Sequence, residues 1–115
     1  MQDGCVFCRI IAGKVSAKIV YQDDEITAFW DQRPATKIHI LIVPNRHIAS
    51  VNEANEEDAA LLGRLMLKAR EIAAEHGVRD TGYRLIVNVG KGGGQTVYHL
   101  HLHLFAGSNL PTIHR

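Results

Sequence analysis

Three histidines alternate with leucines near the end of the sequence, in the run from Tyr98 to Phe105. Successive side chains of a β-strand point to opposite faces, so His99, His101 and His103 are expected on one face and the leucines on the other. Neutral imidazole is available near pH 7 and is a good acceptor of a phosphoryl group. The pattern therefore predicts a functional site, the alternative being a solvated strand face that happens to be rich in histidine.

A glycine-rich segment leads into the histidines. Residues 90–94 are Gly-Lys-Gly-Gly-Gly, and Gln95 and Thr96 follow them. Glycines let the backbone approach an anionic group closely and present N–H donors to it. A glycine-rich turn followed by a histidine strand is thus suited to hold a phosphate beside a nucleophile.

Length and composition limit the possible classes of protein. A chain of 115 residues, 46% of them hydrophobic, can form one domain with a real core, spanning 1–115. The net charge is +1 and both signs are mixed along the chain, so neither nucleic acid nor a membrane is an expected partner. The N-terminus has no secretory signal pattern, which favours a cytoplasmic protein with reduced Cys5 and Cys8.

The hydrophobic pattern predicts one long helix among five strands. Apolar residues at three- and four-residue steps favour a helix from Asn55 to His76, with Asn55 as N-cap and Gly77 as the stop. Residues 5–13 have the spacing of a short helix. This is an α+β class with an antiparallel sheet. The predicted strands are 17–22, 26–30, 38–43, 83–89 and 97–105, and the predicted buried stripe of the long helix is Ala59, Leu62, Leu65, Met66, Ala69, Ile72 and Ala73.

Cys5 and Cys8 form a Cys-x-x-Cys pair whose role the residues alone leave open. A redox pair is one alternative, although no βαβ pattern surrounds it, and two structural cysteines on a helix are another. Zinc requires four nitrogen or sulfur ligands in a closed tetrahedral site, and His47 and His99 can complete such a set.

The run His-Leu-His-Leu-His-Leu-Phe, preceded by Gly-Gly-Gln-Thr-Val-Tyr, resembles the motif of the histidine triad proteins. It is most similar to their nucleotide-binding branch of nucleoside phosphoramidases, and the resemblance extends from Cys5 to Gly107. It implies a five-stranded sheet joined to that of a second subunit in a two-fold homodimer. Some members carry zinc at the places of Cys5, Cys8, His47 and His99, so the resemblance favours a structural zinc, while the chemistry itself requires no cofactor.

The resemblance also implies roles for individual residues. His101 matches the nucleophile, which forms a covalent nucleotidyl intermediate, and His103 matches a ligand of a phosphoryl oxygen. Asp31 matches the carboxylate that accepts hydrogen bonds from both ribose hydroxyls. The remaining matches are Thr96, Gln95, Asn88 and Gly94 at the phosphate and leaving group, Phe7, Ile10, Val15 and Phe29 at the base, and His39 near the active site. Thr96 keeps the hydroxyl of the serine found in many members, whereas Gln32 replaces an expected apolar residue of the base pocket.

Three functions are compatible with these residues. The first is a purine nucleoside phosphoramidase that binds an AMP- or GMP-type nucleotide and cleaves adenosine 5′-phosphoramidates and related adenylates. The second is a dinucleoside polyphosphate hydrolase on the same scaffold, which the short tail from Ser108 to Arg115 disfavours. The third is a non-enzymatic module that binds nucleotide or zinc, for which a nucleophile such as His101 is unnecessary.

Overall fold

The computed structural model describes residues 2 and 4–110, so the last five residues of the tail lie outside the described part of the chain. The connections between the helices and strands contain three short 3₁₀ turns, which are Val51–Glu53, Glu56–Asp58 and Lys91–Gly93. None of the helices in the described part of the chain has the length and hydropathy that crossing a membrane requires. The helices and strands are α1 (Val6–Ile11), β1 (Ile19–Gln22), β2 (Ile26–Trp30), β3 (Ile38–Pro44), α2 (Ala59–Glu75), β4 (Arg84–Ile86) and β5 (Leu102–Ala106).

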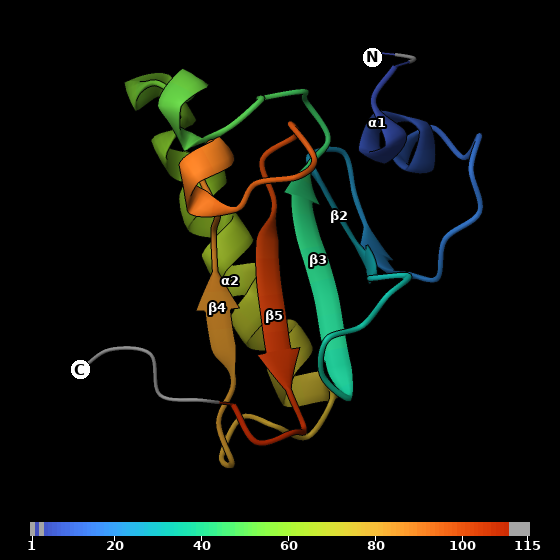
Figure 1. Ribbon diagram of the computed structural model, residues 1–115, viewed down its shortest axis with the longest axis vertical. Coiled ribbons are helices and arrows are strands. Elements are labelled where there is room, and N and C mark those ends of the chain that lie inside the picture. Colours follow the sequence, from blue (N-terminus) through green and yellow to red (C-terminus); the bar gives the residue numbers. More distant parts are fainter. Residues whose placement is uncertain (1, 3, 111–115) are drawn as a thin grey trace.

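All five strands belong to one antiparallel sheet in the order β1-β2-β3-β5-β4. Figure 1 looks onto one face of this sheet, with α2 behind the strands and α1 beside the end of β3. The predicted α+β class, with one long and one short helix, is confirmed.

The two faces of the sheet are covered differently. Behind the sheet, isoleucines and leucines of β2, β3 and β5 pack against Leu65, Ala69 and Ile72 of α2 in one large apolar cluster. On the other face, Phe7 and Ile10 of α1 pack against a smaller cluster of residues from β2 and β3. This second face is covered only in part, and it also carries the histidines. The sheet residues of the smaller cluster are Phe29, Leu41 and Val43.

The predicted cap Asn55 starts a 3₁₀ turn, Glu56–Asp58, and α2 itself begins four residues later than predicted, at Ala59. The Asn55 side chain accepts a hydrogen bond from the N–H of Glu57, and Asp58 accepts one from the N–H of Asn55, so the two form a capping box around one 3₁₀ turn. The prediction that Met66 belongs to the buried stripe is wrong, because 51% of its surface is exposed. It lies one residue, or about 100°, from Leu65 and therefore off the side that contacts the sheet. Ala59 is also exposed, and Leu62 is half-buried.

Three predicted strands are longer than the observed ones, and the first of them, β1, begins at Ile19 where the prediction began at residue 17. β5 begins at Leu102 instead of Val97, and β4 has only three residues, 84–86, where 83–89 was predicted. Continuing the register of β3 and β5 would place Leu100 opposite Pro44, which has no N–H to donate. The N–H of Leu100 donates to the carbonyl of Ile48 instead, so residues 97–101 run alongside the loop after β3.

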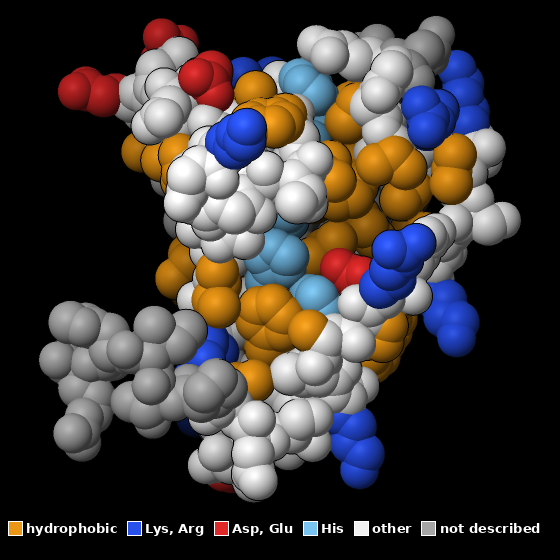
Figure 2. Space-filling model, viewed as in Figure 1, with side chains coloured by type: hydrophobic (Ala, Val, Ile, Leu, Met, Phe, Trp, Pro, Cys, Tyr) orange, Lys and Arg blue, Asp and Glu red, His pale blue; other side chains and the backbone are white. Residues whose placement is uncertain are grey.

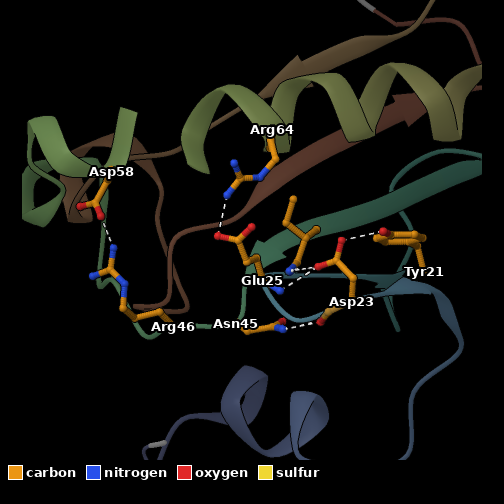
Figure 3. A network of polar contacts seen from close by, with 8 residues as sticks. Tyr21, Asp23, Glu25, Asn45, Arg46, Asp58 and Arg64 are labelled. Carbon is orange, nitrogen blue, oxygen red and sulfur yellow. Dashed lines mark hydrogen bonds and ion pairs between the residues drawn. The ribbon is translucent and has the colours of Figure 1, made fainter. Parts of the chain in front are cut away.

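Polar contacts fix the turn between β1 and β2 and the start of α2 (Figure 3). Asp23 Oδ1 accepts hydrogen bonds from the N–H groups of Glu25 and Ile26, which closes the hairpin. Glu25 pairs with Arg64 of α2 at 2.6 Å, and Arg46 pairs with Asp58 at the 3₁₀ turn. These contacts connect the loop after β3, which carries His47, to the helix behind the sheet.

Candidate active site and metal centre

The alternation predicted for the histidine run holds even where the residues are not in a strand. Leu100, Leu102 and Leu104 point into the apolar cluster beneath α2. The rings of His99 and His101 lie on the other face, with centroids 5.9 and 5.1 Å from that of Phe7. Figure 2 shows histidine side chains at the bottom of a hollow on this face, with an acidic and hydrophobic side chains beside them.

His101 has one ring nitrogen occupied and one free for chemistry. Its Nδ1 lies 2.7 Å from the carbonyl oxygen of His99. A carbonyl only accepts hydrogen bonds, so Nδ1 carries the proton and Nε2 keeps a lone pair. Burial lowers the pKa of His101, and the imidazole is therefore neutral at physiological pH. A neutral, fixed imidazole with a free Nε2 is what a nucleophilic histidine requires.

A chain of hydrogen bonds gives His103 the opposite tautomer. The N–H of Ala35 donates to Nδ1 of His39 at 3.1 Å, so the proton of His39 resides on Nε2. That Nε2–H donates to Nδ1 of His103 at 2.9 Å. Nδ1 of His103 is thus an acceptor, and its Nε2 carries a proton that is free to donate to a ligand. Burial lowers the pKa of His39, and that of His103 to about 4, so this pair is uncharged.

Asp31 lies next to this pair. Its Oδ1 accepts a hydrogen bond from the N–H of Arg33 at 2.8 Å, and its Oδ2 is 3.6 Å from Nε2 of His39. Asp31, His39 and His103 bring three ligand-type atoms within 4.8 Å of one another. The N–H of Ala35 keeps the proton of His39 on Nε2, the nitrogen that faces the other two residues. A metal would need a lone pair at that nitrogen, so this group is arranged to hold a proton instead.

A second group of ligand-type atoms is formed by Cys5, Cys8, His47 and His99, again within 4.8 Å of one another. Nδ1 of His99 lies 3.4 Å from Sγ of Cys5 and 3.6 Å from Sγ of Cys8, and Nδ1 of His47 lies 3.4 Å from Sγ of Cys8. For zinc–sulfur bonds of about 2.3 Å and zinc–nitrogen bonds of about 2.1 Å, tetrahedral sulfur and nitrogen ligands are separated by about 3.6 Å. The four residues therefore fit a zinc ion.

The surroundings of these four residues also suit a metal. Nε2 of His99 donates to the carbonyl of Pro44 at 2.7 Å, which leaves Nδ1 as the coordinating nitrogen. Burial raises the pKa of the Cys5 thiol, so a thiolate here requires a compensating cation. Both cysteines are free, and the prediction that this set comes together in the fold agrees with the geometry.

A cavity of about 340 Å³ lies between α1 and the end of β2. Phe7, Ile10 and Phe29 form an apolar wall, and Asp31 and Gln32 lie at its edge. The rings of Phe7 and Phe29 meet edge to face at 5.3 Å, which keeps the wall rigid. Four of the five residues predicted for the base site therefore line this cavity, and Val15 packs against the apolar cluster behind it.

The glycine-rich segment leads into Thr96, which lines the cavity. Gly94 adopts a left-handed conformation with φ of 85°, and its N–H donates to the carbonyl of Lys91. Gln95 is 5% exposed, with its Oε1 accepting from the N–H of Gly90 and its Nε2 donating to the carbonyls of Ala49 and Val97. The side chain of Gln95 thus holds the loop. Thr96 lines the cavity, and Asn88 is half-buried in the segment after β4.

Some contributors to the site have no local sequence pattern. The carbonyl of Pro44 and the N–H of Ala35 fix two histidine tautomers through backbone atoms, whose identity no side-chain motif reports. The N–H of Arg33 is different, because Asp-x-Arg-Pro is a typical turn composition and predicts a bond from the backbone to Asp31. Val6, Ala17, Trp30, Leu41 and Val97 also line the cavity and were not among the predicted residues.

Known proteins are similar to this chain in sequence and in fold. The family described as scavenger mRNA decapping enzyme C-term binding matches residues 4–112. A purine nucleoside phosphoramidase of Escherichia coli K12 is 44% identical over 110 residues, which are 96% of this chain and 92% of that protein. The crystal structure of a HIT family hydrolase from Legionella pneumophila is 44% identical with a TM-score of 0.91, over 93% of this chain and 96% of that one.

A zinc-bound histidine triad family protein from Mycobacterium smegmatis is 32% identical with a TM-score of 0.78, over 91% of this chain and 76% of that one. With a fold, a triple-histidine site and relatives of this similarity, the chain belongs to the histidine triad (HIT) family of hydrolases.

Proposed function

We propose that the protein is a purine nucleoside phosphoramidase, which cleaves the P–N bond of adenosine 5′-phosphoramidates and related adenylates. The observation that carries the proposal is the hydrogen bond from Nδ1 of His101 to the carbonyl of His99, because it leaves Nε2 free as a nucleophile. The name of the Escherichia coli relative supports the same substrate class.

In the first step, the Nε2 lone pair of His101 attacks phosphorus and forms an N–P bond. The bond to the leaving amine breaks, and the amine departs with its electron pair and with a proton from solvent, which the water consumed in the second step returns. The Nε2–H of His103 donates to a phosphoryl oxygen and stabilises the charge that develops there. The hydroxyl of Thr96 lies at the cavity edge, where it can donate to the leaving nitrogen.

In the second step, water attacks the nucleotidyl-histidine and releases the nucleoside monophosphate. His101 leaves with the electron pair that it contributed and is again a neutral imidazole. Asn88 is a further phosphate contact that we propose, and the N–H of Gly94 would contact the phosphate in exchange for its bond to the carbonyl of Lys91. Gln95 acts indirectly, since its three hydrogen bonds set the position of the glycine-rich segment.

The purine is proposed to occupy the cavity of about 340 Å³, against Phe7, Ile10, Val15 and Phe29, with Gln32 at the mouth. Asp31 is proposed to accept hydrogen bonds from the two ribose hydroxyls. Its Oδ1 is already oriented by the N–H of Arg33, so the carboxylate does not need to reorganise when the ribose binds.

Two structural features complete the proposal. Cys5, Cys8, His47 and His99 are proposed to hold one zinc ion, which would connect α1, the loop after β3 and the histidine segment without entering the chemistry. A two-fold homodimer is proposed through the edge of the sheet at β4, where Val87 is 40% exposed.

The test is hydrolysis of adenosine 5′-phosphoramidate, followed by release of AMP. Wild-type protein is expected to turn the substrate over, and His101→Ala is expected to lose activity by about 10⁴-fold or more while retaining AMP binding. Wild-type protein denatured at alkaline pH, where the N–P bond to imidazole survives, should carry an adenylyl group on His101, detected by peptide mass spectrometry. Near wild-type turnover by the alanine variant would reject the covalent mechanism.

A further inference from the structure

The N–H at Nε2 of His39 faces two acceptors at once. Its hydrogen bond to Nδ1 of His103 is 2.9 Å long, and Oδ2 of Asp31 lies 3.6 Å from the same nitrogen. A carboxylate is the stronger of these two acceptors because it carries a charge. The side chains of His39 and Asp31 are 5% and 24% exposed, so water screens the competition for this proton only in part.

The two imidazole rings are held in place, so the carboxylate is the part of this group that can adjust. The N–H of Ala35 donates to Nδ1 of His39 at 3.1 Å, and a flip of that ring would break the bond. The ring of Phe105 packs against both imidazoles, with centroid distances of 4.2 Å to His39 and 5.2 Å to His103. If Oδ2 of Asp31 came closer by about 0.8 Å, it would form a charge-assisted hydrogen bond and draw the proton of His39 away from His103.

We propose that the ribose hydroxyls of the substrate end this competition, so that Asp31 couples recognition of the sugar to the proton donor His103. The proposal rests on the proposed function, in which Asp31 accepts hydrogen bonds from both hydroxyls. Those bonds occupy Oδ2 and weaken its attraction for the N–H of His39, which is then left to His103. Nδ1 of His103 stays an acceptor, and its Nε2 keeps the proton that contacts the phosphoryl oxygen.

One turn after β2 carries both parts of this coupling. Oδ1 of Asp31 accepts from the N–H of Arg33 at 2.8 Å, and the N–H of Asp31 donates to the carbonyl of His39 at 3.0 Å. The same turn presents the N–H of Ala35 that sets the tautomer of His39. Ribose binding retains the observed orientation of Asp31 and excludes the one in which it takes the proton. Loss of the hydroxyls therefore lowers the rate of the chemical step as well as the affinity.

The experiment compares adenosine 5′-phosphoramidate with its 2′,3′-dideoxy analogue in single turnovers at saturating protein. For the wild type, P–N cleavage should be about three- to tenfold slower with the dideoxy compound, the effect of one weakened hydrogen bond. Asp31→Asn keeps the shape of the side chain but removes the charge that competes for the proton. Its rate should be equal for the two compounds, and with the dideoxy compound it should exceed that of the wild type. His39→Phe has no proton to share and should also give equal rates, at a lower level.

Equal wild-type rates with both compounds, or an Asp31→Asn rate with the dideoxy compound no higher than that of the wild type, would overturn the coupling and leave the phosphoramidase function intact. Failure of the wild type to cleave either compound would instead reject the proposed function. In that case nitrogen-15 NMR with AMP and 2′,3′-dideoxy-AMP tests the coupling without turnover. A stronger hydrogen-bond shift at Nδ1 of His103 with AMP than with dideoxy-AMP supports the coupling. Identical spectra, including those in which neither nucleotide binds, overturn it.

Discussion

The two faces of the sheet use the same alternating sequence for opposite purposes. Towards α2, the side chains of Leu100, Leu102 and Leu104 share one apolar environment, and any of them contributes mainly by the volume that it fills. On the other face, three identical imidazoles have three different hydrogen-bond environments. Packing therefore defines one face, whereas single hydrogen bonds, most of them from backbone atoms, define the chemistry of the other.

On the histidine face, small differences in hydrogen bonding distinguish the three roles proposed for the histidines. His99, His101 and His103 follow one another at two-residue steps, yet their free nitrogens differ. A carbonyl fixes the proton on Nε2 of His99 and on Nδ1 of His101, and His39 directs Nδ1 of His103. In the proposed mechanism these nitrogens serve as one metal ligand, one nucleophile and one donor.

The largest change in stability is expected on the α2 face. Leu104 is fully buried, and Leu104→Ala should lower the free energy of unfolding by about 2–5 kcal/mol, because it removes buried methyl groups and leaves a cavity. Denaturant unfolding measures the loss. Turnover per folded molecule should stay near that of the wild type, and a large loss of turnover in fully folded variant would show that the two faces are not separable.

Removal of a metal ligand should affect the histidine face indirectly, by destabilising the segments that hold the histidines in place. Protein purified without chelators is expected to contain about one zinc per chain. Cys8 is 1% exposed, and Cys8→Ser should release the metal and lower Tm more than it lowers turnover by the remaining folded protein, since metal binding and folding are linked. Met66→Ser on the exposed side of α2 is a matched surface control. Metal-free wild-type protein, with both thiols alkylated in the native state, would contradict the site.

A smaller effect is expected when His39 is replaced. In His39→Phe the ring shape is kept, but His103 loses the donor to its Nδ1 and with it the preference for a proton on Nε2. Turnover should fall by about tenfold, the value of one lost hydrogen bond of about 1.4 kcal/mol. The loss should appear in kcat more than in KM. An unchanged kcat would mean that His103 does not need His39 to present its proton.

The smallest effect concerns pH. Burial lowers the pKa of His103 to about 4 and also lowers that of His39, whereas both groups bind protons near pH 6.5 in the unfolded chain. Between these values the unfolded state binds more protons than the folded state, so stability falls as the pH is lowered from about 6.5 towards 4. Comparing unfolding curves of wild type and His103→Asn isolates this contribution. The variant should show a shallower decline, and parallel declines would contradict the buried, uncharged pair.

Sequence reasoning was most successful where side chains alone decide the outcome. Alternation predicted the two faces of the histidine segment. Asn55 caps the 3₁₀ turn that leads into the long helix, and Gly77 lies just beyond the end of that helix. Sequence reasoning was less successful where a distant part of the chain determines whether a residue pairs or is buried. The ladder ends at Leu102 because Pro44 offers no N–H, and Met66 is exposed because the sheet reaches only one side of α2.

The most direct test of the different roles of these histidines is their tautomeric state. Nitrogen-15 NMR of the imidazoles at neutral pH distinguishes a proton on Nδ1 from a proton on Nε2, and single-histidine variants assign the signals. His101 is expected to carry its proton on Nδ1, while His99 and His103 carry theirs on Nε2. A proton on Nε2 of His101 in the folded, ligand-free protein would contradict the proposal that the backbone prepares this residue as the nucleophile.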